Sequence, residues 1–549
     1  MLKKIMIFLF LIPLFSTSIL YSQNKNMPKL VVGIVVDQMR YDYLTKYEDK
    51  FSEGGFKRLM TEGSFFTNAH LNYIPAYTAP GHSSIYTGTT PNFHGIIAND
   101  YFDRFSKKMI YCLDDSSYYT LGGNDDAGEV SPKNLLASTI TDELKLYSNG
   151  KSKIVSASIK DRGAVIPGGH LADQVYWYDK NNGNFISSTY YMDNLPAWVI
   201  RFNAAHYAES YMNKEWNLLL PYENYSFAIA DDSPWEEDVF SENKHTFPHS
   251  FSNLSEDDKI RKLPDSPFGN DMLFDFVEEA IDNEQLGKSN VTDFLAVSFS
   301  STDYIGHAFG PNSYEIMDTY LRLDRIIEKL LKKLDETAGY GNYIVFLTAD
   351  HAGSDAFGYL KKDRMPTGAI STKDNREKLY SFAAEKYGDS KIIENYSNLQ
   401  IFLNYDYMQQ KNLDPKKVRA EFAGFLKNNF TEISKVFTRD ELENLYPERD
   451  GNNFVRNGYN SLRSGDIAME LQPGMVFWEP SKHASTHETR YSYDSHIPLL
   501  FYGWNIPVQR VNSPVYVVDI APTVADLLGI REPNCSIGIP LINKIQKAK

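Results

Sequence analysis

Five short apolar runs constrain the fold of this chain more than any other feature. Each is rich in β-branched residues and has the length of a buried strand. Between the third and fourth runs, Ile, Leu and Met recur at helical spacing, so strand, helix and strand follow one another. The pattern predicts an α/β fold with a mostly parallel central sheet flanked by helices. The runs are LVVGIVV (30–36), KIVSASI (153–159), DFLAVSFS (293–300), YIVFLTA (343–349) and IPLLFYG (497–503).

Carboxylate and imidazole side chains follow three of these runs at the same relative place. Asp37 follows the first run, Asp303 and His307 follow the third, and Asp350 and His351 follow the fourth. Any one of them alone could be a helix cap or a solvated surface pair. In a doubly wound sheet, however, ligands bind at the carboxyl ends of the strands. We therefore expect these groups to converge on one edge of the sheet.

The segment KHASTHETRYSYDSH (482–496) adds His483, His487 and His496 just before the fifth run. Three carboxylates and three imidazoles are enough to hold two metal ions with open positions for a substrate. Oxygen and nitrogen ligands favour Zn²⁺, with Mn²⁺, Fe and Co²⁺ as alternatives. Two such ions about 4 Å apart form a clamp for in-line displacement at phosphorus.

The stretch YIPAYTAPGHSSIYTG (73–88) supplies a candidate nucleophile. Pro80 and Gly81 indicate a turn, and HSSIYTG after them is suited to the first turns of a helix. Thr78 then lies beside a helix N-terminus, where unpaired N–H groups and the helix dipole favour an anion. An ordinary loop-to-helix junction is the alternative interpretation of this segment.

Five motifs together resemble the alkaline phosphatase superfamily: VVDQMRYDYL, YTAPGHSSIYTGTTPNFHGIIAND, SFSSTDYIGHAFGP, LTADHAG and VDIAPTVADLLGI. More closely, they resemble secreted alkaline phosphatases of the type I phosphodiesterase/nucleotide pyrophosphatase branch that use a threonine nucleophile. The resemblance implies two zinc ions per chain and Thr78 as the nucleophile. It implies Asp37, Thr78, Asp350 and His351 as ligands of one ion, and Asp303, His307 and His487 as ligands of the other.

The last of these ligands departs from the family pattern. Glu488 follows His487 where the family usually has a glycine. His483 and His496 are therefore kept as alternatives to His487.

Three features bear on the class of ester. A sulfatase nucleophile motif, C-x-P-x-R or S-x-P-x-R, is replaced here by TAPGH at 78–82. Lys160 and Arg162 lie two residues apart after a predicted strand, so in an extended chain both would project to one side. They suit the additional charged oxygen of a monoester, although a solvated basic pair has the same spacing. The resemblance implies that Asn99 also donates to a phosphoryl oxygen; a turn-forming asparagine is the alternative.

The sequence thus predicts an alkaline phosphatase that hydrolyses small phosphate monoesters through a phosphothreonine on Thr78, with an alkaline pH optimum. A phosphodiesterase or nucleotide pyrophosphatase on the same two-metal frame is the main alternative. A binding protein with intact metal ligands and no turnover is an alternative of a different class.

The N-terminal residues predict export. MLKKIMIFLFLIPLFSTSILYSQ has two lysines, an apolar run and then small residues, as in a signal peptide (1–22), with Ser18 and Ser22 as possible cleavage positions. An uncleaved membrane anchor is the alternative. We expect a periplasmic or secreted monomer without stable membrane association. The net charge of −15 disfavours nucleic acid as a partner.

The remaining chain, 23–549, is expected to be a single catalytic domain. Two regions fit the strand pattern less well, at about 171–290 and 360–480, and we expect both to be insertions that build a cap. Cys112 and Cys535 are the only cysteines, and the sequence leaves open whether they pair.

Overall fold

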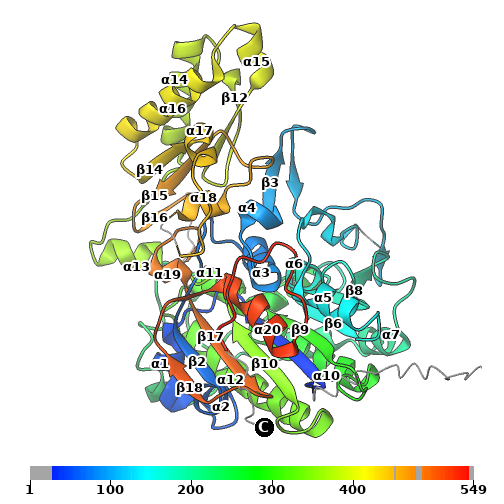
Figure 1. Ribbon diagram of the computed structural model, residues 1–549. Coiled ribbons are helices and arrows are strands. Elements are labelled where there is room, and N and C mark those ends of the chain that lie inside the picture. The colour runs from blue at the N-terminus through cyan, green and yellow to red at the C-terminus, as the bar shows by residue number, and fades with distance from the viewer. Residues whose placement is uncertain (1–26, 125, 451–452, 478–484, 543–549) are drawn as a thin grey trace, which may run out of the picture.

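A computed structural model describes residues 27–124, 126–450, 453–477 and 485–542. The predicted signal peptide lies outside them. Figure 1 shows a large sheet with its helices in the lower part of the molecule and a smaller unit above it. Within the described residues, no helix combines the length and apolar character needed to cross a bilayer.

The five apolar runs all lie in one large sheet. Its centre is β1 (Leu30–Val36), which pairs in parallel with β9 (Asp293–Phe299) on one side and β10 (Tyr343–Thr348) on the other. All residues of these three strands are buried, because helices cover both faces of the sheet. The strand order is β18-β2-β17-β10-β1-β9-β6-β7-β8-β5, with β6 at Ile154–Ser158, β7 at Gln174–Tyr178, β8 at Phe185–Ser188, β2 at Ser64–His70, β17 at His496–Gly503, β18 at Gln509–Val511 and β5 at Thr120–Leu121.

The fifth run corrects one detail of the prediction. Strand β17 is antiparallel to β10 rather than parallel. The chain between these two strands leaves the sheet at the carboxyl end of β10 and returns at the same edge. The returning strand must therefore run in the opposite direction, and the sheet is mixed although its centre is parallel.

Two groups of helices pack on this sheet. In one group, α3 (Thr78–Thr87) contacts α6 (Arg162–Gly168) and α20 (Ile520–Leu528). In the other, α10 (Phe268–Asn283) and α11 (Ser301–Phe309) contact α12 (Tyr314–Thr337). The 24-residue α12 buries its apolar stripe, and the Ser313 side chain caps its start by accepting from the Ile316 amide.

The expected insertion at about 171–290 requires correction. Strands β7 and β8 extend the large sheet, and α10 packs on it. Many of its apolar side chains, including Trp198, Trp216 and Phe276, belong to the main hydrophobic core. This region is therefore part of the lower unit. Its aromatic and polar composition hid the strands, because β7 and β8 are short and rich in tyrosine and serine.

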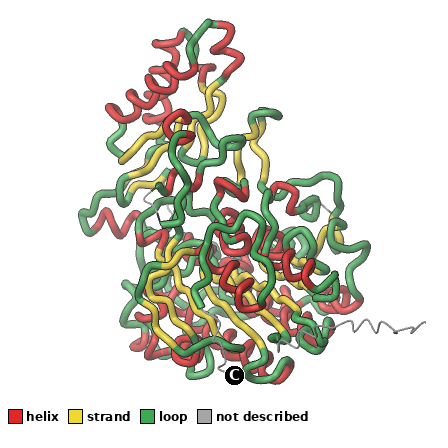
Figure 2. Tube along the Cα trace, in the orientation of Figure 1, coloured by secondary structure: helices red, strands yellow, loops and turns green. Residues whose placement is uncertain are grey.

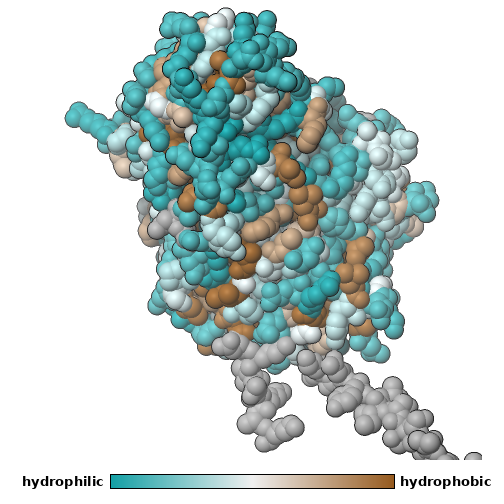
Figure 3. All heavy atoms as spheres, turned by 45° about the horizontal axis from the view of Figure 1, so that its top comes forward, coloured by the Kyte–Doolittle hydropathy of each residue, from teal (hydrophilic) through white to brown (hydrophobic). Residues whose placement is uncertain are grey.

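Residues 368–450 and 453–477 form a second subdomain, which lies between β10 and β17 in the chain. Figure 2 shows its strands and helices apart from the large sheet. Its four-stranded sheet and two long helices enclose a core of their own around Leu379, Ile401 and Phe422. Figure 3 shows that its outer surface is mainly hydrophilic. The elements are β12 (Ile393–Ser397), β13 (Gln400–Leu403), β15 (Ile467–Leu471), β14 (Ile433–Thr438), α14 (Lys373–Tyr387) and α16 (Pro415–Asn429).

A hairpin of the lower unit reaches this subdomain. Strands β3 (Asp100–Asp103) and β4 (Lys108–Tyr111) rise toward it in Figure 1. Just beyond β3, Arg104 forms an ion pair with buried Asp466 at 3.0 Å. The ring of Phe102 also packs edge-on against Phe402, with centroids 5.2 Å apart.

Candidate active site

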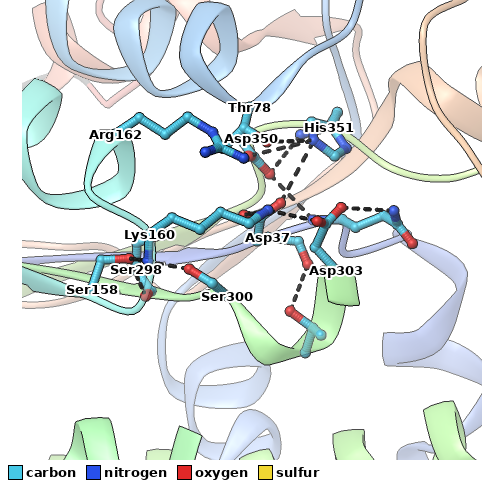
Figure 4. Close-up of polar contacts among 12 residues, drawn as sticks. Asp37, Thr78, Ser158, Lys160, Arg162, Ser298, Ser300, Asp303, Asp350 and His351 are labelled. Carbon is cyan, nitrogen blue, oxygen red and sulfur yellow. Dashed lines mark hydrogen bonds and ion pairs between the residues drawn. The ribbon is translucent and has the colours of Figure 1, made fainter. Parts of the chain in front are cut away.

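Three buried aspartates meet at the carboxyl edge of the large sheet. Asp37 follows β1, Asp350 follows β10 and Asp303 lies in the first turn of α11, which follows β9. Lys160 follows β6 and lies between two of them, with its Nζ 2.6 Å from both Asp37 Oδ2 and Asp303 Oδ2. Figure 4 shows these four side chains and Thr78 pointing into one space. Parallel strands that end at the same level therefore bring together residues more than 300 positions apart.

The cluster is short of positive charge. Burial raises the pKa of Asp37 well above its usual value, and the nearby Asp350 carboxylate raises it further. Asp37 Oδ1 and Asp350 Oδ2 are buried and have no hydrogen-bond partner among the described residues. A buried carboxylate oxygen is costly unless a cation or a donor satisfies it. Lys160 alone does not satisfy all of these oxygens, so the set suits one or more additional cations.

Three imidazoles stand beside the carboxylates with a common orientation. His351 Nε2 lies 3.5 Å from Asp350 Oδ2, and His307 Nε2 lies 3.2 Å from Asp303 Oδ1. His487 Nε2 lies 3.6 Å from Asp303 Oδ1, and its ring stacks on that of His351 with centroids 3.5 Å apart.

The opposite nitrogen of each ring faces a backbone carbonyl. His351 Nδ1 is 2.9 Å from the Ala352 oxygen, His307 Nδ1 is 2.7 Å from Ser485 and His487 Nδ1 is 2.6 Å from Ala76. A carbonyl oxygen can only accept, so Nδ1 carries the proton and Nε2 keeps its lone pair in the neutral ring. Burial lowers the pKa of His351 and His487, which favours that neutral form. This is the arrangement of metal-ligating histidines.

The described residues offer two overlapping groups of metal-ligand atoms, each within 4.8 Å. One comprises Asp37, Asp350 and His351, and the other comprises Asp303, His351 and His487. His351 belongs to both groups, whereas the sequence-based assignment gave it to one ion only. The donor set of carboxylate oxygen and imidazole nitrogen suits Zn²⁺ and similar divalent ions.

Thr78 is the first residue of α3 and is buried beside these groups. Its Oγ1 lies 3.5 Å from His351 Nε2. The next amide, of Ala79, donates to the Asn99 side-chain oxygen at 2.9 Å, which fixes Asn99 beside the helix N-terminus. Gly81 allows the helix to approach the centre closely, because a Cβ there would lie 2.4 Å from the Asp350 carbonyl oxygen.

Arg162 begins α6, and its side chain extends toward Thr78 and Asp350 in Figure 4. Its buried Nε has no hydrogen-bond partner among the residues that the structure describes. The neighbouring Asp161 carboxylate accepts hydrogen bonds from the Arg162 backbone amide and, at 2.6 Å, from the Tyr111 hydroxyl. Lys160 and Arg162 therefore present two cations from one strand end to the space around Thr78.

Sequence reasoning missed two supporting residues. His82 Nδ1 lies 2.9 Å from the Thr78 carbonyl oxygen and 3.3 Å from Asp350 Oδ2, and its Nε2 is 2.8 Å from Ser298 Oγ. Its position four residues after Thr78, on the same helix face, was the available signal. Gln38 donates from Nε2 to Asp303 Oδ1 at 2.8 Å, in a left-handed backbone conformation (φ 62°) that the sequence does not indicate.

The alternative histidines lie elsewhere or outside the described residues. His496 stacks between Tyr41 and His70, with ring centroids 4.4 Å and 4.6 Å away, and does not join the cluster. His483 lies outside the described residues.

Glu488 is buried and accepts from the Tyr77 hydroxyl at 3.2 Å and from the Phe477 amide. Cys112 and Cys535 are both free thiols.

The fold and this centre place the protein in the alkaline phosphatase superfamily. A family model described as type I phosphodiesterase/nucleotide pyrophosphatase matches residues 31–496. The chain therefore belongs to the type I phosphodiesterase/nucleotide pyrophosphatase family, as the sequence motifs predicted.

Relatives align over almost the whole chain. A protein of Myroides odoratus named calcium-transporting ATPase is 41% identical, with 97% of each chain covered. Alkaline phosphatase PhoV of Synechococcus elongatus is 42% identical over 94% of this chain and 93% of its own. Alkaline phosphatase PafA of Elizabethkingia meningoseptica is 40% identical over 94% of both chains. The crystal structure of wild-type PafA superposes with a TM-score of 0.89 at 40% identity and covers 94% of this chain and 98% of its own. The predicted fold class and enzyme class, alkaline phosphatase, are confirmed.

Proposed function

We propose that this protein is an exported two-zinc alkaline phosphatase that hydrolyses small phosphate monoesters through a phosphothreonine on Thr78. The observation that carries the proposal is the position of Thr78. Its hydroxyl lies among three buried aspartates, three imidazoles and two basic side chains, contributed by strand ends far apart in the sequence.

The described ligand groups support the metal part of the proposal. Asp37, Asp350 and His351 would hold one ion with Thr78, and Asp303, His307 and His487 would hold the other, with His351 near both. When bound, the two ions would activate the hydroxyl and neutralise charge on the departing oxygen. The Nε2 atoms of the three histidines face the carboxylates, as this role requires.

The chain's own residues would carry the transfer. Thr78 loses its hydroxyl proton to solvent as Oγ1 attacks phosphorus; the Oγ1–P bond forms, the bond from phosphorus to the alcohol oxygen breaks, and the departing oxygen takes a proton from water. Water then hydrolyses the phosphothreonine, releasing phosphate and restoring the hydroxyl. His82 holds the Thr78 carbonyl oxygen, and this contact fixes the first turn of α3 during both steps.

Asn99, Lys160 and Arg162 would hold the non-bridging phosphoryl oxygens. Because the Asn99 amide oxygen already accepts from Ala79, its NH₂ group is the end that can donate. A monoester presents one more charged oxygen than a diester, and two cations beside Thr78 match that additional charge. This supports a monoesterase over the alternative that the family description names, a phosphodiesterase or nucleotide pyrophosphatase.

A rate comparison tests the proposal. We expect the purified protein to bind two zinc ions per chain and to have a much larger kcat/KM for an aryl phosphate than for its methyl ester. A preference for the methyl ester would establish the diesterase alternative. Two bound zinc ions without hydrolysis of either ester would indicate a binding protein.

A further inference from the structure

A cavity of about 530 Å³ lies beside the proposed nucleophile, between the lower unit and the second subdomain. We propose that it receives the alcohol part of the substrate, and that Arg376 selects phosphate monoesters whose alcohol part carries a second anionic group. This inference rests on the proposed monoesterase function. The lining residues used below are Tyr77, Asn99, Arg376, Asn395, Tyr396 and Asn398.

The inner wall of the cavity is next to the reacting groups. Tyr77 directly precedes Thr78 and forms the extended N-cap of α3. Asn99 contacts the Ala79 amide in the first turn of that helix. A phosphoryl group on Thr78 would therefore have this space at its side, and the only part of a monoester large enough to occupy 530 Å³ is its alcohol.

The outer wall holds an oriented cation. Arg376 lies in the first turns of α14, and its Nε donates to Ser371 Oγ at 2.8 Å. Its guanidinium lies over the ring of Tyr396, 5.5 Å from the centroid. Tyr396 is itself buried and packs edge-on against Phe477, with centroids 5.2 Å apart. A guanidinium positioned by such contacts is suited to a carboxylate or phosphate, because less side-chain freedom is lost on binding.

The hairpin that carries Tyr396 is fixed to the lower unit. Its two turn residues, Asn398 and Leu399, both have left-handed conformations, with φ of 50° and 60°. A leucine at such an angle is strained, by about 1 kcal/mol or more, so surrounding contacts must hold it. Leu399 is buried, and Asn398 Nδ2 donates to the Asp100 carbonyl oxygen at 2.7 Å. Asp100 follows Asn99, so this contact fixes the outer wall relative to the phosphoryl site.

A second cavity near the centre differs in charge, because its described lining has no Lys or Arg, whereas the lining of the first cavity includes Arg376 together with one carboxylate, Asp100. Its volume is about 770 Å³, and it borders His307 and Ser485. The described residues that line it include four carboxyl groups, those of Glu237, Asp355, Glu488 and Asp494. Burial raises the pKa of Glu488 to about 8 and the pKa of Asp494 to about 7, so these two contribute only part of a negative charge near neutral pH. An anionic alcohol part is therefore disfavoured there and favoured beside Arg376. The amides of Asn395 and Asn398 add hydrogen-bonding groups suited to hydroxyls on the same ligand.

Two matched substrates test this inference. Para-propylphenyl phosphate and para-carboxyethylphenyl phosphate have similar size, and only the second carries an additional anion. We expect Arg376→Ala to lower kcat/KM for the carboxylate substrate roughly tenfold and for the propyl substrate less than about twofold. Arg376→Lys should retain part of the preference. Lys373→Ala, which removes a charge from a largely exposed position on the same helix, should leave the ratio unchanged.

Salt provides a second measurement on the unmodified protein, independent of any variant's folding. If Arg376 attracts the carboxylate, the ratio of the two kcat/KM values falls as salt is raised, because the ions screen that attraction. Equal losses on both substrates in Arg376→Ala, or a salt-independent ratio in the wild type, would overturn the inference while leaving the monoesterase proposal intact. Failure of the wild-type protein to hydrolyse either substrate would overturn both.

Discussion

The centre at the strand ends and the cavity beneath the second subdomain are built in different ways. The first uses side chains that follow paired strands of one sheet, where Val36 lies opposite Phe299 and Val35 opposite Thr348. The second uses a hairpin and a helix from a unit with its own sheet and core. The difference shows that strand register positions the proposed reacting groups, whereas the proposed selection of the alcohol part comes from a separately packed unit.

Metal removal should have the largest effect on the strand-end centre. A chelator is expected to abolish activity, and added Zn²⁺ should restore it. Because the unfolded chain lacks a formed site, zinc should also raise the melting temperature, by an amount that grows with its concentration. Calorimetry with and without zinc provides this second measurement. Full activity after exhaustive chelation would show that the carboxylates hold no required ion.

Thr78→Ala should reduce kcat by at least about a thousandfold, since it removes the proposed nucleophile. Metal content should remain close to that of the wild type, because the carboxylates and imidazoles are unchanged. Elemental analysis and steady-state kinetics on the same preparation check both points. Ser83→Ala is a suitable control, as that buried hydroxyl bonds to the Ala79 carbonyl oxygen within α3. An unchanged kcat in Thr78→Ala would refute the nucleophile assignment.

Replacement of Lys160 and Arg162 by Ala should lower the rate of monoester hydrolysis much more than the rate of diester hydrolysis. We expect a loss of roughly a hundredfold or more for an aryl phosphate, because each charged donor stabilises the transferring group. The loss for the corresponding methyl ester should be less than about tenfold. Lys160 also bridges Asp37 and Asp303, so metal content must be measured in the variant. Losses of the same size on both esters would argue against the proposed role.

Asn398→Ala should give the smallest effect of these changes. It tests the second of the two compared regions, the cavity beneath the second subdomain. It removes the hydrogen bond to the Asp100 carbonyl oxygen and disfavours the left-handed turn. We expect KM to rise about twofold to tenfold, with kcat nearly unchanged, since the strand-end groups are not touched. Steady-state kinetics with an aryl phosphate measures both constants. A large fall in kcat at constant KM would show that the hairpin also supports the reacting groups.

Much of the lower unit could be predicted from the sequence because its strands are long, apolar runs with polar residues at their ends. Asp37, Asp303 and Asp350 follow such runs, and the parallel arrangement of the strands places them together. The strands at 174–178 and 185–188 escaped prediction because tyrosine and serine replace the usual aliphatic residues. The direction of β17 was also missed, since periodicity carries no information about strand polarity.

The environment of the site was less accessible to sequence reasoning. The left-handed Gln38 and the sharing of His351 between two ligand groups depend on backbone angles and distances. Arg376 carried no signal at all, because its importance arises from a hairpin folded against a different part of the chain. The role of His82 could have been predicted from its helical spacing to Thr78, but that spacing was not used.

The second subdomain occupies the stretch of chain between His351 and His487, whose rings stack on each other. The two ends of this long segment therefore lie beside the same pair of stacked rings. On the proposed metal assignment, a displacement of the subdomain would affect a ligand residue, His487, as well as the cavity wall beside Tyr77. Any exchange of this module for another, in evolution or in engineering, must therefore preserve the spacing of its two attachment points if the proposed zinc binding and the proposed substrate preference are to be kept.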